Sequence, residues 1–220
     1  MTTPVAIEIT RWYLAGFFLF VAVFYCCRLL LARTLGGQPR VTYGRPGTHH
    51  WRLSLTFRVF RSLILGLMIA RVPWPSLDDL LLPCPALMIA PVIIAGNILL
   101  ASSFGFVIYC NVFMGRAWRS GVPDSQIPPL ITDGPFRWSR NPAFLGVQAA
   151  QFGFFLALPS VFTFVCLLVG VTVIQMQVRL EERHLAATFG QAYERYKGGT
   201  PRWLGVTPCP ADAAPSRPSA

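Results

Sequence analysis

The chain has 220 residues, of which 54% are hydrophobic and only 13% are charged, and this composition is too apolar for an ordinary water-soluble domain. Its 17 Phe, 6 Trp and 6 Tyr residues also exclude a chain that is disordered throughout. The formal net charge is +10, but the basic residues flank apolar runs, which favours membrane lipid headgroups over nucleic acid as the partner.

Apolar runs long enough to cross a bilayer as helices predict an all-α polytopic membrane protein. The first run covers residues 12–32. The second covers residues 53–70 and contains Arg58 and Arg61, whose long side chains can reach the nearest interface. An amphipathic helix that lies in the interface is the alternative for this second run.

The remaining crossings are set by prolines. A third helix is expected to begin near Ala86 or Pro91, because prolines crowd the start of its apolar run. Residues 143–178 are apolar or neutral with Pro159 near the middle, which predicts a C-terminal helical hairpin with a turn at residues 158–160. The sequence therefore predicts about five transmembrane helices.

Charge asymmetry between the loops predicts the orientation. Residues 33–52 hold four arginines and no acid, whereas residues 72–84 hold Asp78 and Asp79 and no base. Since cytoplasmic loops collect Lys and Arg, we expect the first loop inside, the second outside and the N-terminus outside. No basic segment precedes the first apolar run, so this run is expected to be a retained anchor and not a cleaved signal peptide.

Two polar segments bracket the predicted hairpin, which should place both on the cytoplasmic side. In the first, residues 131–146, the pair Asn141 and Pro142 predicts the start of a helix. The free N–H groups of such a helix start, with Arg137 and Arg140 close by, would form a receptor for a carboxylate or phosphate. Alternatively, Asn141 only caps the helix and the arginines only contact lipid headgroups.

The second polar segment, residues 179–193, continues the last apolar helix beyond the bilayer. It carries Glu181 and Glu182, which are about 100° apart on a helix, so that both cannot face one small pocket. We expect one to bind a ligand and the other to pair with an arginine such as Arg179, Arg183 or Arg137. A solvated helix face whose acids balance its bases is the alternative.

Gly190 is expected to end this helix, and Tyr193 and Tyr196 would share one face of a short helix that follows. Tyrosines in such a position are more often packing residues than ligands. The 3 His and 6 Cys residues show neither metal-site nor disulfide spacing, so no metal is expected.

The motifs are Gly134-Pro-Phe-Arg-Trp-Ser-Arg-Asn-Pro-Ala-Phe-Leu-Gly146, a hairpin, Glu181-Glu-Arg-His-Leu185, Phe189-Gly-Gln-Ala-Tyr193 and Thr200-Pro-Arg-Trp203. In this order they resemble the isoprenylcysteine carboxyl methyltransferase family and its phospholipid N-methyltransferase relatives. That family's pattern is approximately G-P-Y-R-x-x-R-H-P-x-Y-x-G, E-E-x-x-L, F-G-x-x-Y-x-x-Y and P-R. Asn141 therefore stands where the family has His, and Phe144 where it has Tyr. Residues 115–122 also look like the stretch that precedes the motif in bacterial members.

The resemblance implies a membrane methyltransferase that uses S-adenosylmethionine, bound in a cytoplasmic pocket between the last two membrane helices and the C-terminal segment. The cofactor-binding residues that it implies are Arg140, Asn141, Pro142, Gly146, Glu181, Glu182 and Tyr193. The candidates for holding a carboxylate acceptor during methyl transfer are Arg137, Arg140 and Arg202. Methyl transfer is mostly a matter of alignment and needs no covalent nucleophile.

The expected organisation is an N-terminal membrane part (1–109), a methyltransferase core (110–204) and a disordered tail (205–220). The expected reaction is isoprenylcysteine-type carboxyl O-methylation of a lipophilic or prenylated acceptor in a bacterial plasma membrane, with phospholipid N-methylation as the alternative. A nicotinamide-dependent membrane sterol-type reductase, or a non-catalytic scaffold or transporter, is a further alternative. Reductases carry a similar H-P-x-Y-x-G element, but Phe144 and Val147 argue against them here.

Overall fold

The computed structural model describes residues 2–34, 49–115 and 130–205. These residues form helices and no named strand, which confirms the all-α class. The elements are α1 (Thr3–Thr34), α2 (His49–Ala70), α3 (Leu77–Leu80), η1 (Pro85–Leu87), α4 (Ala90–Met114), η3 (Gly134–Arg137), α5 (Pro142–Ala157), α6 (Val161–Phe189) and α7 (Gln191–Gly199). The stretch expected before the motif, the predicted disordered tail from residue 206 and most of the arginine-rich first loop lie outside the described residues.

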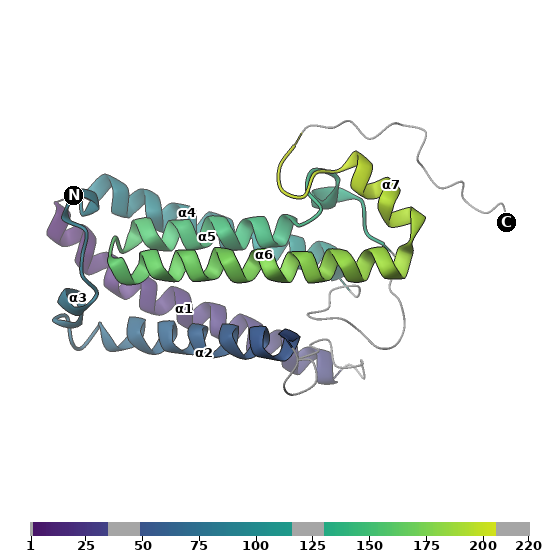
Figure 1. The fold of residues 1–220 in the computed structure, drawn as a ribbon. Helices are drawn as coiled ribbons and strands as arrows, with labels where there is room; N and C mark the ends of the chain where they lie inside the picture. The colour runs from purple at the N-terminus through teal and green to yellow at the C-terminus, as the bar shows by residue number, and fades with distance from the viewer. Residues whose placement is uncertain (1, 35–48, 116–129, 206–220) are drawn as a thin grey trace.

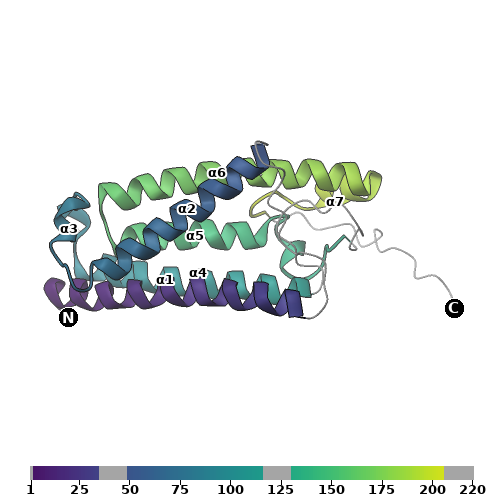
Figure 2. The ribbon, with the colours of Figure 1, turned by 90° about the horizontal axis from the view of Figure 1, so that it is seen from below.

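The long helices alternate in direction along one common axis (Figure 1). Helices α4, α5 and α6 run together, and α1 and α2 pack along one side of them, with α2 crossing obliquely in the second view (Figure 2). The N-terminus and α3 lie at one end of the bundle, while α7 and the start of α5 lie at the other. The acidic segment around α3 is thus at the end opposite to the predicted site, as the predicted topology requires.

Three of the described helices are long and apolar enough to cross a membrane, and their spans are Thr3–Cys27, Ala90–Met114 and Val161–Phe189. Helix α5 is apolar but has only 16 residues. Helix α2 has 22 residues and carries Arg52, Arg58 and Arg61. The chain is therefore an all-α membrane protein in which the five predicted helices all form, while the number that cross completely stays a prediction.

Prolines mark the starts of α4 and α5 and the turn between α5 and α6. Helix α4 begins at Ala90 with Pro91 in its first turn, which agrees with the later of the two predicted starts. The hairpin turn lies at residues 158–160 as predicted, and Pro159 is fully buried there. Ser160 and Thr163 form a reciprocal capping box that begins α6.

Glycines set the close contact between α4 and α5. A Cβ atom on Gly153 would lie 2.6 Å from the backbone nitrogen of Leu100, and one on Gly96 would lie 2.3 Å from the backbone nitrogen of Ala157. A Cβ atom on Gly146 would lie 2.8 Å from the Val107 side chain. Small residues at a membrane helix interface allow such backbone approach, so these glycines fix where the start of α5 lies.

The end of the bundle around α3 is fastened by ion pairs. Asp78 accepts hydrogen bonds from Arg71 Nε (2.5 Å) and Arg11 Nη2 (2.8 Å), and Arg11 also pairs with Glu8. Burial works to raise the pKa of Asp78, but the hydrogen bonds from the two arginines outweigh it and lower that pKa. The acidic loop therefore takes its bases from α1 and from the residue after α2, which loop composition alone did not reveal.

Candidate functional site

The site is built on the turn that precedes α5. Gly134 begins η3 with φ at +56°, and a Cβ atom there would lie 2.3 Å from the Phe113 ring at the end of α4. A glycine is therefore required on both conformational and steric grounds. This turn brings the first motif segment back over the end of the bundle.

Asn141 precedes α5, and Pro142 is the first residue of that helix, as the sequence predicts. The Asn141 side chain does not cap the helix, however. Its Nδ2 donates to Glu182 Oε1 at 3.2 Å and to the Arg202 carbonyl oxygen at 3.3 Å. The predicted helix start is confirmed, but the amide of Asn141 is directed to α6 and to the C-terminal segment instead of to the helix backbone.

Glu182 is the centre of the cluster. Arg202 donates to it from Nη2 at 2.7 Å to Oε2 and from Nε at 3.1 Å to each oxygen. Arg140 Nη1 lies 3.4 Å from Oε1, which is an ion pair without hydrogen-bond geometry. Two guanidinium groups thus share one carboxylate, and this part of the site carries one excess positive charge.

Glu181 has a separate environment. Its Oε1 accepts a hydrogen bond from Gln177 Nε2 at 2.9 Å, one turn earlier on α6. The two acids face different neighbours, as their helical spacing predicts. The arginines that pair with Glu182 are Arg140 and Arg202, and not Arg179, Arg183 or Arg137, which the sequence suggested.

The segment 200–203, which we call the C-terminal strap, lies against the turn before α5. The Arg140 backbone N–H donates to the Pro201 carbonyl oxygen at 2.9 Å. Ser139 is 2% exposed, and its hydroxyl donates to the Arg202 carbonyl oxygen at 3.1 Å while accepting from the Asn141 N–H. The strap is therefore held through its backbone independently of the Arg202 side chain.

Helix α7 folds back beside this cluster from the end of α6, after Gly190, where φ is +51° (Figure 1). Tyr193 and Tyr196 share one face of α7, with their ring centroids 6.1 Å apart. The Tyr196 hydroxyl donates to the Phe136 carbonyl oxygen at 2.7 Å. Burial raises the pKa of both phenols, and the charge of Glu182 adds to the rise for Tyr193, so both stay protonated near neutral pH.

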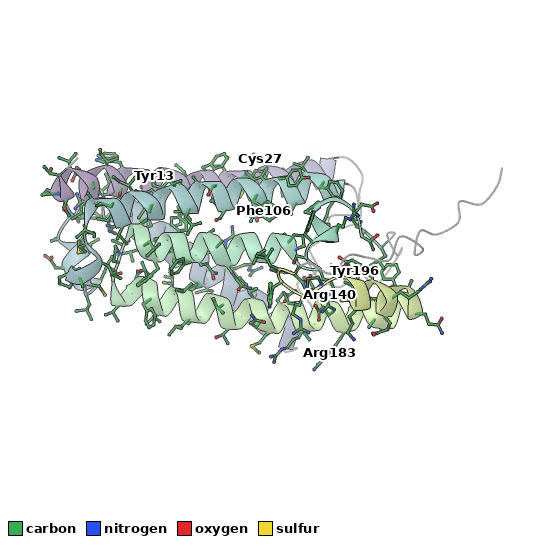
Figure 3. The ribbon with its side chains drawn as sticks, turned by 90° about the horizontal axis from the view of Figure 1, so that it is seen from above. Tyr13, Cys27, Phe106, Arg140, Arg183 and Tyr196 are labelled. Carbon is green, nitrogen blue, oxygen red and sulfur yellow. The ribbon has the colours of Figure 1, made fainter. Side chains whose placement is uncertain are left out.

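Several buried polar atoms in this cluster have no hydrogen-bond partner. They are Nε and Nη1 of Arg140, of which Nη1 keeps its ion pair with Glu182, and the hydroxyl oxygen of Tyr193, which lies beside Arg140 without hydrogen-bond geometry. Figure 3 shows Arg140 and Tyr196 in the same cluster, whereas Arg183, the neighbour of Glu182, points away from it. Unpaired buried donors are costly, and their concentration beside Glu182 marks a place for an anionic or hydroxyl-bearing ligand.

The structure brings together five of the predicted site residues: Arg140, Asn141, Glu182, Tyr193 and Arg202. Pro142 is buried next to them, and Gly146 contacts α4. Arg137 is exposed, and no described ion pair joins it to the cluster. Ser139 was missed by the sequence argument, and its only signal was a small polar residue two positions before the helix start.

Within the described residues, no group of three His, Cys, Asp or Glu side chains could hold a metal ion. Residues 88–192 match the family of phospholipid methyltransferases. The matched stretch contains the first polar segment, the hairpin and all of the second polar segment except Tyr193, and it ends before the strap. The isoprenylcysteine family expected from the motifs is not confirmed. No curated protein and no solved structure matches the chain.

Proposed function

We propose that this protein is an integral membrane methyltransferase that uses S-adenosylmethionine to methylate a lipophilic acceptor. The observation that carries the proposal is the cluster of Arg140, Asn141, Glu182 and Arg202 at the end of the hairpin, with unpaired donors beside a carboxylate. The match to phospholipid methyltransferases supports the reaction class. The positive-inside argument supports a site on the cytoplasmic face of a bacterial plasma membrane.

The residues present fit the amino-acid end of the cofactor. Its carboxylate requires donors, and Nε and Nη1 of Arg140, which lack hydrogen-bond partners, would provide them, with the Tyr193 hydroxyl nearby. Its ammonium requires an acid, for which Glu182 is the candidate. Pro142 and Gly146 would hold the start of α5 in place, and Glu181 is a second acid on the same helix turn. When bound, the cofactor supplies a methyl group on a sulfonium that is already activated for direct displacement.

The positive excess of the site favours an acceptor that carries an anionic oxygen group. A carboxylate acceptor needs no general base and is held by arginine, so Arg140 and Arg202 suit the isoprenylcysteine-type carboxyl O-methylation that the motifs imply. Exposed Arg137 lies within the same turn and could meet the acceptor or the lipid headgroups. The apolar body of the acceptor would remain in the bilayer beside the hairpin.

Phospholipid N-methylation is the second candidate, because the matched family bears that name. A phospholipid also brings an anionic phosphate to the arginines, but its amine must lose a proton before it can accept a methyl group. Assays with labelled S-adenosylmethionine should therefore compare farnesylcysteine with phosphatidylethanolamine.

Binding to the detergent-solubilised protein tests the class itself. We expect calorimetry to show binding of S-adenosylmethionine and of its demethylated product, S-adenosylhomocysteine, and no binding of NADPH. The Arg140→Gln substitution should weaken the binding of both ligands. The Arg183→Gln substitution changes an exposed arginine next to Glu182 on α6, and it should leave the binding of both ligands unchanged. Tight NADPH binding without a response to S-adenosylmethionine would overturn the proposal in favour of a reductase.

A further inference from the structure

The carboxylate of Glu182 is fully used in this structure. Four nitrogen atoms surround its two oxygens: Nη2 of Arg202, Nε of Arg202, which is shared between both oxygens, Nδ2 of Asn141, and Nη1 of Arg140 as an ion pair at 3.4 Å. A carboxylate offers about four acceptor positions, so another donor can bind only where one of these leaves. The site as it stands therefore has no place for an ammonium group on Glu182.

Arg202 is the partner that can leave. Its side chain is 38% exposed, whereas the side chains of Arg140 and Glu182 are 9% and 10% exposed. An exposed guanidinium regains its hydration when it swings away, but a buried one does not. Asn141 is itself buried and is fixed by the start of α5.

The backbone of the strap need not move for this exchange. The Pro201 and Arg202 carbonyl oxygens are held by the Arg140 N–H, the Ser139 hydroxyl and the Asn141 amide. These bonds are independent of the Arg202 guanidinium. The side chain can thus turn outward into solvent from a backbone that keeps its place beside the cluster.

The charges of the cofactor's amino-acid end are compatible with the exchange. Arg140, Arg202 and Glu182 together carry one excess positive charge, and the carboxylate and ammonium of the cofactor add no net charge to it. Departure of Arg202 into water leaves Arg140, Glu182 and this end of the cofactor without excess charge. The freed guanidinium is then available for an anionic group.

We propose that Arg202 is a switch that makes the two substrates bind in order. In the free protein its guanidinium occupies the position on Glu182 that the cofactor's ammonium would take. When the cofactor binds, Arg202 turns outward and binds the anionic oxygen group of the acceptor, a carboxylate or a phosphate. This inference rests on the proposed function, and it predicts that the acceptor binds well only after the cofactor.

The first test measures cofactor affinity in Arg202→Gln, with Arg183→Gln as the matched control and S-adenosylhomocysteine as the probe. Without the Arg202 guanidinium, the ammonium group of the probe no longer has to displace a competitor from Glu182. Binding should therefore tighten by about tenfold, which is the contribution of about one charge-assisted hydrogen bond. An analogue of the probe that lacks the ammonium should show no gain. Arg202→Lys keeps the positive charge, so its affinity for S-adenosylhomocysteine should lie between those of the parent and of Arg202→Gln. Arg202→Lys also takes the place of Arg202→Gln in this test if the latter does not fold.

The second test measures the affinity of the parent protein for farnesylcysteine and for phosphatidylethanolamine in detergent, each with and without S-adenosylhomocysteine. We expect the true acceptor to bind about tenfold more tightly with S-adenosylhomocysteine present. In Arg202→Gln the affinity should be low in both conditions. Which of the two ligands responds distinguishes a carboxylate from a phosphate as the anionic group.

Weaker cofactor binding in Arg202→Gln would make Arg202 a direct cofactor ligand and would overturn the switch. Unchanged cofactor affinity, or an acceptor that binds equally well with and without S-adenosylhomocysteine, would also overturn it. A parent protein that binds no S-adenosylhomocysteine at all would instead refute the proposed function, so the two failures are distinguishable.

Discussion

The Asn141→Asp substitution distinguishes two roles of Asn141, a simple helix cap and a side chain that binds Glu182. The two roles differ because a simple cap would not contact Glu182. In the parent, the Asn141 amide donates to Glu182 Oε1 at 3.2 Å and to the Arg202 carbonyl oxygen at 3.3 Å. The variant replaces this donor with a carboxylate that faces two acceptors. An Asp at the helix start would otherwise cap as well as Asn and would suit the helix dipole.

The size of the effect follows from the geometry. Two unit charges about 4 Å apart repel by about 4 kcal/mol at an effective dielectric constant of about 20. Arg140 and Arg202 offset part of this repulsion, so we expect a loss of about 2 kcal/mol or more in the free energy of unfolding. The loss should shrink at low pH, because protonation of either carboxyl group removes the repulsion.

The assay is equilibrium unfolding in mild detergent without cofactor, comparing the parent with Asn141→Asp and Asn141→Ala. The aspartate variant should be less stable than the alanine variant, and adding Glu182→Gln to Asn141→Asp should restore part of the loss. Asn141 acts as a simple helix cap, and its contact with Glu182 contributes nothing, if Asn141→Asp is as stable as the parent while Asn141→Ala is destabilised.

Three further predictions concern the rest of the fold. Asp78→Asn should lower the free energy of unfolding by about 3 kcal/mol, because Arg71 is 1% exposed and would lose its partner. The pKa of Asp78 is lowered in the folded protein, so the stability that Asp78 contributes is present at neutral pH and is lost as the pH falls through this lowered pKa. The free energy of unfolding of the parent, measured against pH, should therefore decrease on the acid side, and Asp78→Asn should lack this decrease. Gly153→Ala should cost about 1–3 kcal/mol because its Cβ would lie 2.6 Å from the Leu100 backbone, whereas Gly105→Ala, with nothing within 4 Å, should be tolerated, as thermal unfolding of both can show. Reporter fusions after Gly44, Asp79 and Ser120 should read inside, outside and inside, and a cytoplasmic signal after Asp79 would show that α2 does not cross.

The helices could be predicted because each depends on local signals. Apolar runs gave their existence and Pro91, Pro142 and Pro159 gave their ends, since proline lacks the N–H that a helix interior requires. The hairpin then placed Asn141 and Glu182 on the same side of the bundle. The topology predicts that the two segments are neighbours, whereas the hydrogen bond between the Asn141 and Glu182 side chains was not predicted.

The contacts of Arg202 could not be predicted in the same way. The strap follows α7 and is placed by backbone hydrogen bonds to Ser139 and Arg140, which no periodic pattern encodes. Arg11 and Asp78, 67 residues apart, illustrate the same limit at the other end of the bundle. A long arginine can pair with any acid within its reach, so composition fixes the kind of partner but not which one.

The two ends of the bundle use arginine in opposite ways. Around α3, two arginines meet two acids, Asp78 and Glu8, and the charges balance. At the site, Arg140 and Arg202 meet Glu182 alone, and Nε and Nη1 of Arg140 are left without hydrogen-bond partners, whereas at the α3 end Nε of Arg11 is left without one. Balanced and buried pairs fasten helices but attract no ligand, whereas an excess charge with unpaired donors attracts an anion. Binding of an anionic group is therefore expected at the α7 end of the bundle, and the ion pairs around α3 serve the fold.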